Sequence, residues 1–183
     1  MPLVSLVFLE RIAVLRLLQV FMNICLFQAR PQDLPASRFL FIGSLLITAI
    51  TGLPSLILAT GTLGLAVVAV LMDVALTLLF LRWGLYFLQL EPRFLQSATA
   101  LFGTGVIFNL VAVPVQQTLA GAETGGGQAV VGGLLFLVLL GWNLAVNGHI
   151  LRHTLSIRLA GGIAIALVYY LLILMLVQQL PVG

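Results

Sequence analysis

Five long apolar runs, separated by short connections, constrain this 183-residue chain more than any other feature. An α-helix needs about 20 residues to cross a hydrocarbon core roughly 30 Å thick. In lipid, such a helix satisfies its backbone hydrogen bonds within itself. The sequence therefore predicts an all-α fold, an integral membrane bundle of five transmembrane helices. We place the spans at about 39–59, 63–82, 97–116, 128–149 and 158–177.

The basic side chains, all of them arginines, indicate an orientation. They are Arg11, Arg16, Arg30 and Arg38 before the first span, Arg82 and Arg93 after the second, and Arg152 and Arg158 after the fourth. The connections near 60–64 and 117–127 carry none. Because cytoplasmic connections are enriched in Lys and Arg, this alternation predicts a cytoplasmic amino end and a carboxyl end on the opposite side. We expect the location to be a bacterial inner (cytoplasmic) membrane.

Composition supports a membrane protein and excludes some partners. Hydrophobic residues make up 62% of the chain and charged residues only 7%, whereas about a quarter of a soluble domain is charged. The arginines form no stripe that predicts nucleic-acid binding, so anionic lipid headgroups are their simpler partners. Cys25 is the only cysteine, which excludes an internal disulfide and predicts a buried, inert thiol.

Residues 1–30 form a more polar segment with two possible placements. Arg16, Gln19 and Asn23 recur at helical steps that also reach Arg30, which predicts a polar seam on one helix face. Such an amphipathic helix fits the inner membrane interface, with its arginines toward headgroups. The alternative is a sixth crossing, which would bury Arg16 at a cost of about 2.5–3.5 kcal/mol. We favour the interfacial helix.

The connections carry turn and cap signals. Two prolines make residues 30–38 a rigid break, and Asp33 or Ser37 can cap the helix that follows. Residues 60–62 predict a tight outer turn, and the glycine-rich stretch 120–127 predicts an exposed outer loop.

A stripe of small residues marks the first span. Ser44, Thr48 and Gly52 recur every four residues and so share one helix face. Small side chains let a second helix approach closely in a membrane. We therefore expect this stripe to be a helix-packing surface.

Several polar residues lie within the apolar runs. Asp73 falls near the middle of the second span, and Asn109 or Thr77 could donate a hydrogen bond to it. Asp73 is interpreted either as a protonation or cation site or as a hydrogen-bonded carboxyl that fixes helix packing. Asn143 and Asn147, one turn apart, indicate either structural hydrogen bonds between helices or a polar cavity open to the cytoplasm.

No metal, cofactor or catalytic site is predicted. His149 and His153 lie one turn apart, but two imidazoles make only half of a four-ligand zinc site, and no cysteine or nearby carboxylate completes it. With Arg152, they are expected to form a cytoplasmic-face cluster near the headgroups. Phosphate-binding glycine loops, nucleophile elbows and HExxH pairs are absent from the sequence, so we do not expect an enzyme.

Two stretches resemble the Yip family (Ypt-interacting-protein-like membrane proteins). Residues 31–37 (PQDLPAS) are similar to the segment that leads into the first span of small bacterial members. Residues 142–153 (WNLAVNGHILRH) are similar to the end of their fourth span. Over about 30–180, the resemblance implies a cytoplasmic amphipathic segment, five spans and a short outer carboxyl end. It supplies no catalytic residues, and the Rab-linked trafficking role of eukaryotic relatives is not carried over.

The sequence leaves two main functional hypotheses. The first is a non-enzymatic scaffold or accessory protein that acts through helix packing, with a membrane-protein partner or as a homo-oligomer. The alternative is a small transporter or channel that uses Asp73, Asn109 and Asn143. A minor third hypothesis is a role in membrane shape, with residues 3–29 wedged into one leaflet.

Overall fold

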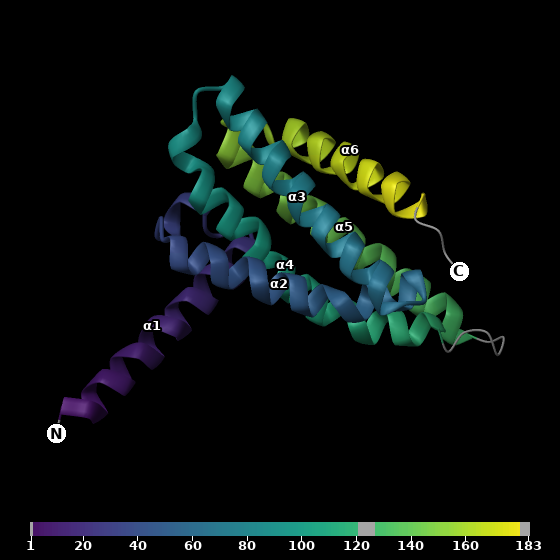
Figure 1. Cartoon of the computed structure of the whole chain (residues 1–183), viewed down its shortest axis with the longest axis horizontal. Coiled ribbons are helices and arrows are strands. Elements are labelled where there is room, and N and C mark those ends of the chain that lie inside the picture. Colours follow the sequence, from purple (N-terminus) through teal and green to yellow (C-terminus); the bar gives the residue numbers. More distant parts are fainter. Residues whose placement is uncertain (1, 121–126, 180–183) are drawn as a thin grey trace.

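The structure, a computed structural model, describes residues 2–120 and 127–179. Within these residues it consists of helices and connections (Figure 1). The α-helices are α1 (Pro2–Cys25), α2 (Arg38–Thr60), α3 (Leu63–Phe87), α4 (Phe94–Ala120), α5 (Gly127–Leu155) and α6 (Leu159–Gln178). Five of them, α2 to α6, are long and apolar enough to cross a membrane. The predicted all-α bundle with five candidate spans is therefore confirmed.

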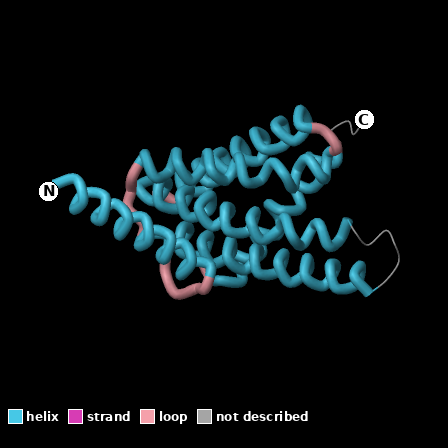
Figure 2. Tube along the Cα trace, turned by 90° about the horizontal axis from the view of Figure 1, so that it is seen from below, coloured by secondary structure: helices cyan, strands magenta, loops and turns pink. Residues whose placement is uncertain are grey.

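The five long helices form an open ring. In space, each packs against the next in the order α3, α2, α4, α5 and α6. Helices α3 and α6 are the two ends of this ring, and side chains bridge the gap between them. Helix α1 packs on the outside, against α4 and α5, and its amino-terminal part projects away from the bundle (Figures 1 and 2).

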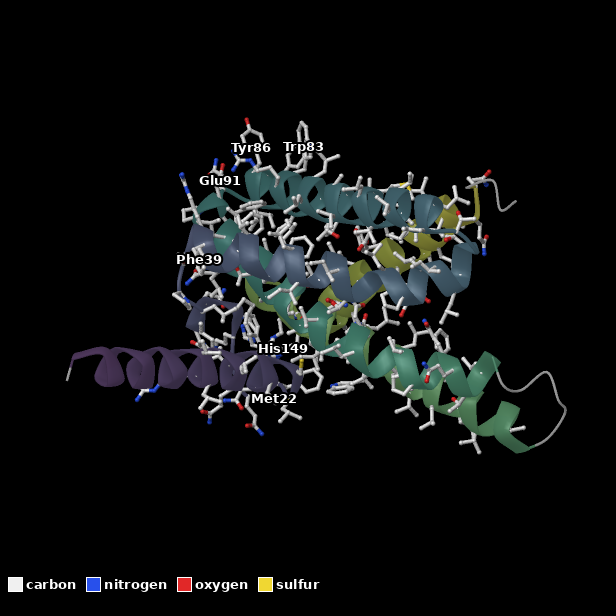
Figure 3. The ribbon with its side chains drawn as sticks, turned by 60° about the horizontal axis from the view of Figure 1, so that its bottom comes forward. Met22, Phe39, Trp83, Tyr86, Glu91 and His149 are labelled. Carbon is white, nitrogen blue, oxygen red and sulfur yellow. The ribbon has the colours of Figure 1, made fainter. Side chains whose placement is uncertain are left out.

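One end of the bundle, called here the arginine-bearing end, gathers the basic residues that flank the long helices. Arg38 begins α2, and Arg93 precedes α4. Arg152 lies in the last turn of α5. Trp83, Tyr86 and Phe87 lie near the same end of α3, with exposed fractions of 53%, 60% and 74%. Figure 3 shows Trp83 and Tyr86 pointing outward from the bundle, which is typical of aromatic residues at a membrane interface.

The helix caps follow the local sequence. The Ser37 hydroxyl accepts a hydrogen bond from the Leu40 amide (3.4 Å) and caps α2. At the opposite end of α2, Gly61 adopts φ 76°, a left-handed conformation that suits glycine, and Thr62 caps α3. The predicted Ser37 cap and the tight turn at 60–62 are therefore confirmed. The predicted loop at 120–127 falls largely on residues 121–126, outside the described residues.

Three helices stop at left-handed residues that are not glycine. Phe27, Gln89 and Ser156 have φ values of 62°, 56° and 58°. The amide after each donates to a carbonyl five residues earlier: Gln28 to Asn23 (2.8 Å), Leu90 to Leu85 (2.8 Å) and Ile157 to Arg152 (3.1 Å). This Schellman geometry closes each helix sharply. For a residue with a Cβ it costs roughly 1–2 kcal/mol, so surrounding contacts must stabilise each turn.

Two predicted boundaries are corrected. Helix α1 ends at Cys25, so Arg30 lies in the following connection and not on the polar face of the helix. Helix α5 continues to Leu155, six residues beyond the predicted span, because the turn at Ser156 is what stops it. Arg152 and His153 therefore belong to the last turn of α5, where we had expected a connection.

The carboxyl-terminal end of α1 is part of the core. The Phe21 ring lies directly over Gly103 of α4, where a Cβ atom would overlap it. The Trp142 indole donates from Nε1 to the Cys25 carbonyl (2.9 Å), and the Cys25 side chain is fully buried. A neighbouring face of α1 is apolar and exposed, with Leu15, Leu18 and Met22. The membrane-interface position of α1 stays a prediction.

Helices α5 and α6 cross at two glycines. Gly148 and Gly162 face each other so closely that a Cβ on Gly162 would overlap the Gly148 carbonyl. A Cβ on Gly148 would lie 2.8 Å from the Ile163 amide nitrogen. Glycine is required at this crossing because the two backbones are in contact.

Candidate functional site

The open ring encloses a hollow, called here the polar cavity, of about 390 Å³. All five long helices line it, and most of its wall is aliphatic or aromatic. The polar groups that line it are Thr48, Ser55, Asp73, Thr77, Asn109, Asn143, Asn147, Tyr169 and Tyr170. An apolar hollow of this size with a few converging polar groups is typical of a small-molecule site.

Asp73 is held by a tyrosine from the opposite end of the ring. The Tyr169 hydroxyl of α6 lies 3.2 Å from the Asp73 carboxyl oxygen Oδ1 and 2.6 Å from the Thr77 hydroxyl. A phenol has one proton, so both hydrogen bonds form when Tyr169 donates to Asp73 and the Thr77 hydroxyl donates to Tyr169. The prediction that Asn109 or Thr77 donates directly to Asp73 is wrong, because Thr77 reaches it only through Tyr169.

Asn109 instead joins α4 to α2. Its amide nitrogen donates to the Thr48 carbonyl (3.2 Å) and to the Thr51 hydroxyl (3.3 Å). Gly52 makes room for this contact, because a Cβ there would lie 3.3 Å from the Asn109 nitrogen. Its amide oxygen has no hydrogen-bond partner among the described residues, and the residue lines the polar cavity.

The small-residue stripe of α2 contacts α4 of the same chain. The Thr48 hydroxyl donates to the Phe102 carbonyl of α4, and Gly52 lies against Asn109. Ser44 is buried but bonds within its own helix, to the Phe41 carbonyl (2.9 Å). Thr48 and Gly52 are therefore occupied by packing inside the molecule.

Asn143 and Asn147 bring further polar atoms to the polar cavity. The Asn147 nitrogen donates to the Asn143 oxygen (2.9 Å) along one face of α5. Among the described residues, the remaining amide nitrogen of Asn143 and oxygen of Asn147 have no hydrogen-bond partner. The Ser55 hydroxyl, from α2, is buried without a partner as well. These atoms are available to a bound solute.

The polar cavity has one carboxyl group and no basic side chain. Of the residues that line this cavity, Asp73 is the only Asp, Glu, Lys, Arg or His. Most of the other side-chain polar atoms there are oxygens. An acid with several hydrogen-bond acceptors suits a cation or a solute rich in N–H and O–H donors. An anion would find no counter-charge.

The residues of the predicted cytoplasmic-face cluster do not all line one hollow. His149 is buried, and its Nε2 donates to the Ala29 carbonyl (3.0 Å), which ties the connection after α1 to α5. Arg152 is exposed and His153 half-buried, and both face a separate hollow at the arginine-bearing end. No group of three metal-ligating side chains occurs among the described residues.

Two residues of functional or packing importance, Tyr169 and Gly162, were not predicted from the sequence. Tyr169 lies midway along α6, beside Tyr170 and between two aliphatic runs, whereas tyrosines in membrane helices usually mark the interfaces. That unusual depth was the available signal. Gly162 carried no comparable signal, because its importance depends on which helix crosses it.

Comparison with known proteins leaves the chain without a family assignment. No family model matches it, and no curated protein or solved structure matches it either. The resemblance to the Yip family stays a prediction.

Proposed function

We propose that this protein is a small integral membrane carrier that binds a cationic or donor-rich solute in the polar cavity, with Asp73 as counter-charge. The observation that supports it is the convergence of Asp73, Asn109, Asn143 and Tyr169, from four helices, on one hollow. Polar residues deep in membrane segments are costly and are commonly retained at solute pathways.

The seam between α3 and α6 is the gate of the proposed carrier. These helices meet there through Tyr169, whose hydroxyl bonds to Asp73 and Thr77 and whose ring centroid lies 5.5 Å from that of Phe80, while the other neighbours in the ring pack along their length. A solute that takes over the hydrogen bonds of Asp73 would replace the contact that joins the two helices. Binding would thus be coupled to separation of α3 from α6.

The scaffold role predicted from the sequence is less well supported. It depended on the stripe Ser44, Thr48 and Gly52, and a partner helix would have to displace α4 to reach Thr48 and Gly52. A scaffold would therefore need another surface. We also propose, from the arginine distribution alone, that the arginine-bearing end faces the cytoplasm of a bacterial cell.

The test is uptake into liposomes that contain the purified protein, with methylammonium, choline and protons as separate probes. We expect the wild type to move at least one probe faster than empty liposomes. Asp73→Asn should lower that rate about tenfold or more, the scale of one lost charge-assisted contact. Glu91→Gln, a carboxyl in the connection before α4, is the matched control and should leave the rate unchanged. Wild-type rates equal to empty liposomes for all three probes, or equal rates for wild type and Asp73→Asn, would overturn the proposal.

A further inference from the structure

A second hollow, called here the arginine hollow, lies at the arginine-bearing end. It has a volume of about 470 Å³. It is formed by the connection after α1, the short turn before α4 and the end of α5. The residues that line it are Arg30, Gln32, Asp33, Arg93, Arg152, His153, Ser156 and Ile157.

Hydrogen bonds to backbone carbonyls hold its walls in place. Arg93 donates from Nη1 to the carbonyls of His153 (3.1 Å) and Thr154 (3.3 Å) and to the Ser156 hydroxyl (2.7 Å). The Gln32 amide nitrogen also donates to the His153 carbonyl (2.9 Å). These donors satisfy the last carbonyls of α5 and fix the connection to it.

The arginine hollow has an excess of positive charge. It contains three guanidinium groups and one carboxylate, Asp33. That carboxylate accepts the Arg30 backbone amide (2.7 Å) and so caps its own turn. Within the described part of the chain, the side chains of Arg30 and Arg152 make no hydrogen bond to a protein acceptor.

One acceptor of a residue that lines the arginine hollow also lacks a partner. The Gln32 side-chain oxygen Oε1 is buried without a hydrogen bond. Since the Gln32 nitrogen is committed to the His153 carbonyl, the amide cannot be turned round to relieve this. A buried polar atom of this kind is satisfied when a ligand or water donates to it.

We propose that the arginine hollow binds a glycerol phosphate group, carried by an anionic phospholipid or by a soluble ester. The planar guanidinium groups of Arg30 and Arg152 match phosphate oxygens, and a glycerol hydroxyl would donate to Gln32. Phosphatidylglycerol provides both groups in one headgroup, whereas phosphatidylcholine has no hydroxyl and carries a cation.

The surroundings favour the lipid as the source. The arginine hollow lies where the candidate spans end, the level at which headgroups lie beside a membrane protein. Ile157 lines the hollow, and the neighbouring Leu159 is 38% exposed, so acyl chains could continue along an apolar surface. Because Arg30 follows α1 and Arg152 belongs to α5, a bound phosphate would hold α1 to the bundle.

The experiment is thermal unfolding of the full-length protein in detergent, with increasing amounts of phosphatidylglycerol, phosphatidylcholine or glycerol 3-phosphate. Native mass spectrometry counts the retained lipids. We expect phosphatidylglycerol to raise the midpoint temperature of unfolding and to stay bound in the mass spectrometer. Phosphatidylcholine should do neither. Arg152→Gln and Arg30→Gln should each weaken binding about tenfold, the scale of one charge-assisted hydrogen bond. Neither change removes a side-chain hydrogen bond within the described residues.

Arg158→Gln is the matched control, because Arg158 is exposed at the same end but does not line the arginine hollow. It should bind like the wild type. Stabilisation by glycerol 3-phosphate as strong as that by phosphatidylglycerol would support the phosphate site and assign it to soluble esters. The proposal is overturned if neither compound binds or if all three arginine variants weaken binding equally.

Discussion

The polar cavity and the arginine hollow are built around ionisable groups of opposite kinds, a carboxyl and guanidinium groups, at different depths. The polar cavity gathers Asp73 and amide side chains from the middle of the helices. The arginine hollow gathers guanidinium groups from helix ends and connections. A carboxyl group can become neutral in an apolar environment by taking up a proton, whereas a guanidinium group keeps its charge. Depth therefore selects which ionisable group the chain can place at each site.

The two sites also differ in how they are held. Across the polar cavity, α3 and α6 are joined by side-chain hydroxyls, through Tyr169 and Thr77. In the arginine hollow, Arg93 and Gln32 bond directly to the backbone carbonyls that end α5. We conclude that the polar cavity is the adaptable site and the arginine hollow the rigid one.

The largest expected effect comes from disturbing the crossing of α5 and α6, the helix that carries Tyr169, although a Cβ on Gly162 would also lie 3.1 Å from the Arg152 amide nitrogen. Gly162→Val would drive a side chain into the Gly148 carbonyl, at a cost of about 1–3 kcal/mol for overpacking. Thermal unfolding in detergent should show this loss of stability as a lower midpoint temperature, and uptake of the probe into liposomes should fall. Gly161→Val is the control, because a Cβ there meets only the end of the Ile157 side chain at 3.5 Å. Equal losses for both variants would contradict the crossing described above.

A second prediction examines the attachment of α1 beside the arginine hollow. Trp142→Phe removes the donor to the Cys25 carbonyl while keeping an aromatic ring against Phe108. The end of α1 should then open more often, and maleimide labelling of Cys25 should accelerate about tenfold, as expected for one lost hydrogen bond. Trp83→Phe is the control, because Trp83 is exposed on α3. Unchanged labelling in Trp142→Phe would show that this bond does not hold α1.

Cys25 also gives a pH prediction. Burial raises the pKa of its thiol from the ordinary 9.0 to about 11, which lowers the thiolate fraction roughly a hundredfold at neutral pH. Labelling through the folded state should therefore keep rising about tenfold per pH unit beyond pH 9, where an exposed thiol levels off. Since the folded protein favours the neutral thiol, this group's contribution to stability is complete below pH 9 and is lost towards pH 11. A plateau near pH 9 would mean that the thiol is accessible.

The smallest effect is expected inside the polar cavity. Tyr169→Phe removes the hydroxyl between Asp73 and Thr77 and should lower the free energy of unfolding by about 1 kcal/mol. Tyr170→Phe is the control, since Tyr170 lines the same cavity without a hydrogen bond to another described residue. If both variants melt alike and transport alike, Tyr169 does not join α3 to α6.

Most residues of the candidate site could be predicted from the sequence, but their hydrogen-bond partners could not. Asp73, Asn109, Asn143 and Asn147 were singled out one by one, because polar residues are rare at such depth, and all four line the polar cavity. The partner of Asp73 was predicted wrongly, because depth alone does not say which helix faces which. Tyr169 comes from α6, the far end of the ring, 96 residues later in the chain.

What the sequence determined by itself is local. Apolar runs of membrane-crossing length predict five long helices, and Ser37 and Gly61 mark where α2 begins and ends, because caps and turns depend on neighbouring residues. Only the tertiary structure decided that Gly162 meets Gly148, that His149 is buried against the connection after α1, and that Arg30 joins Arg152 in one hollow. These contacts depend on the rotation and crossing of helices that are far apart in the chain, and long-range packing sets both.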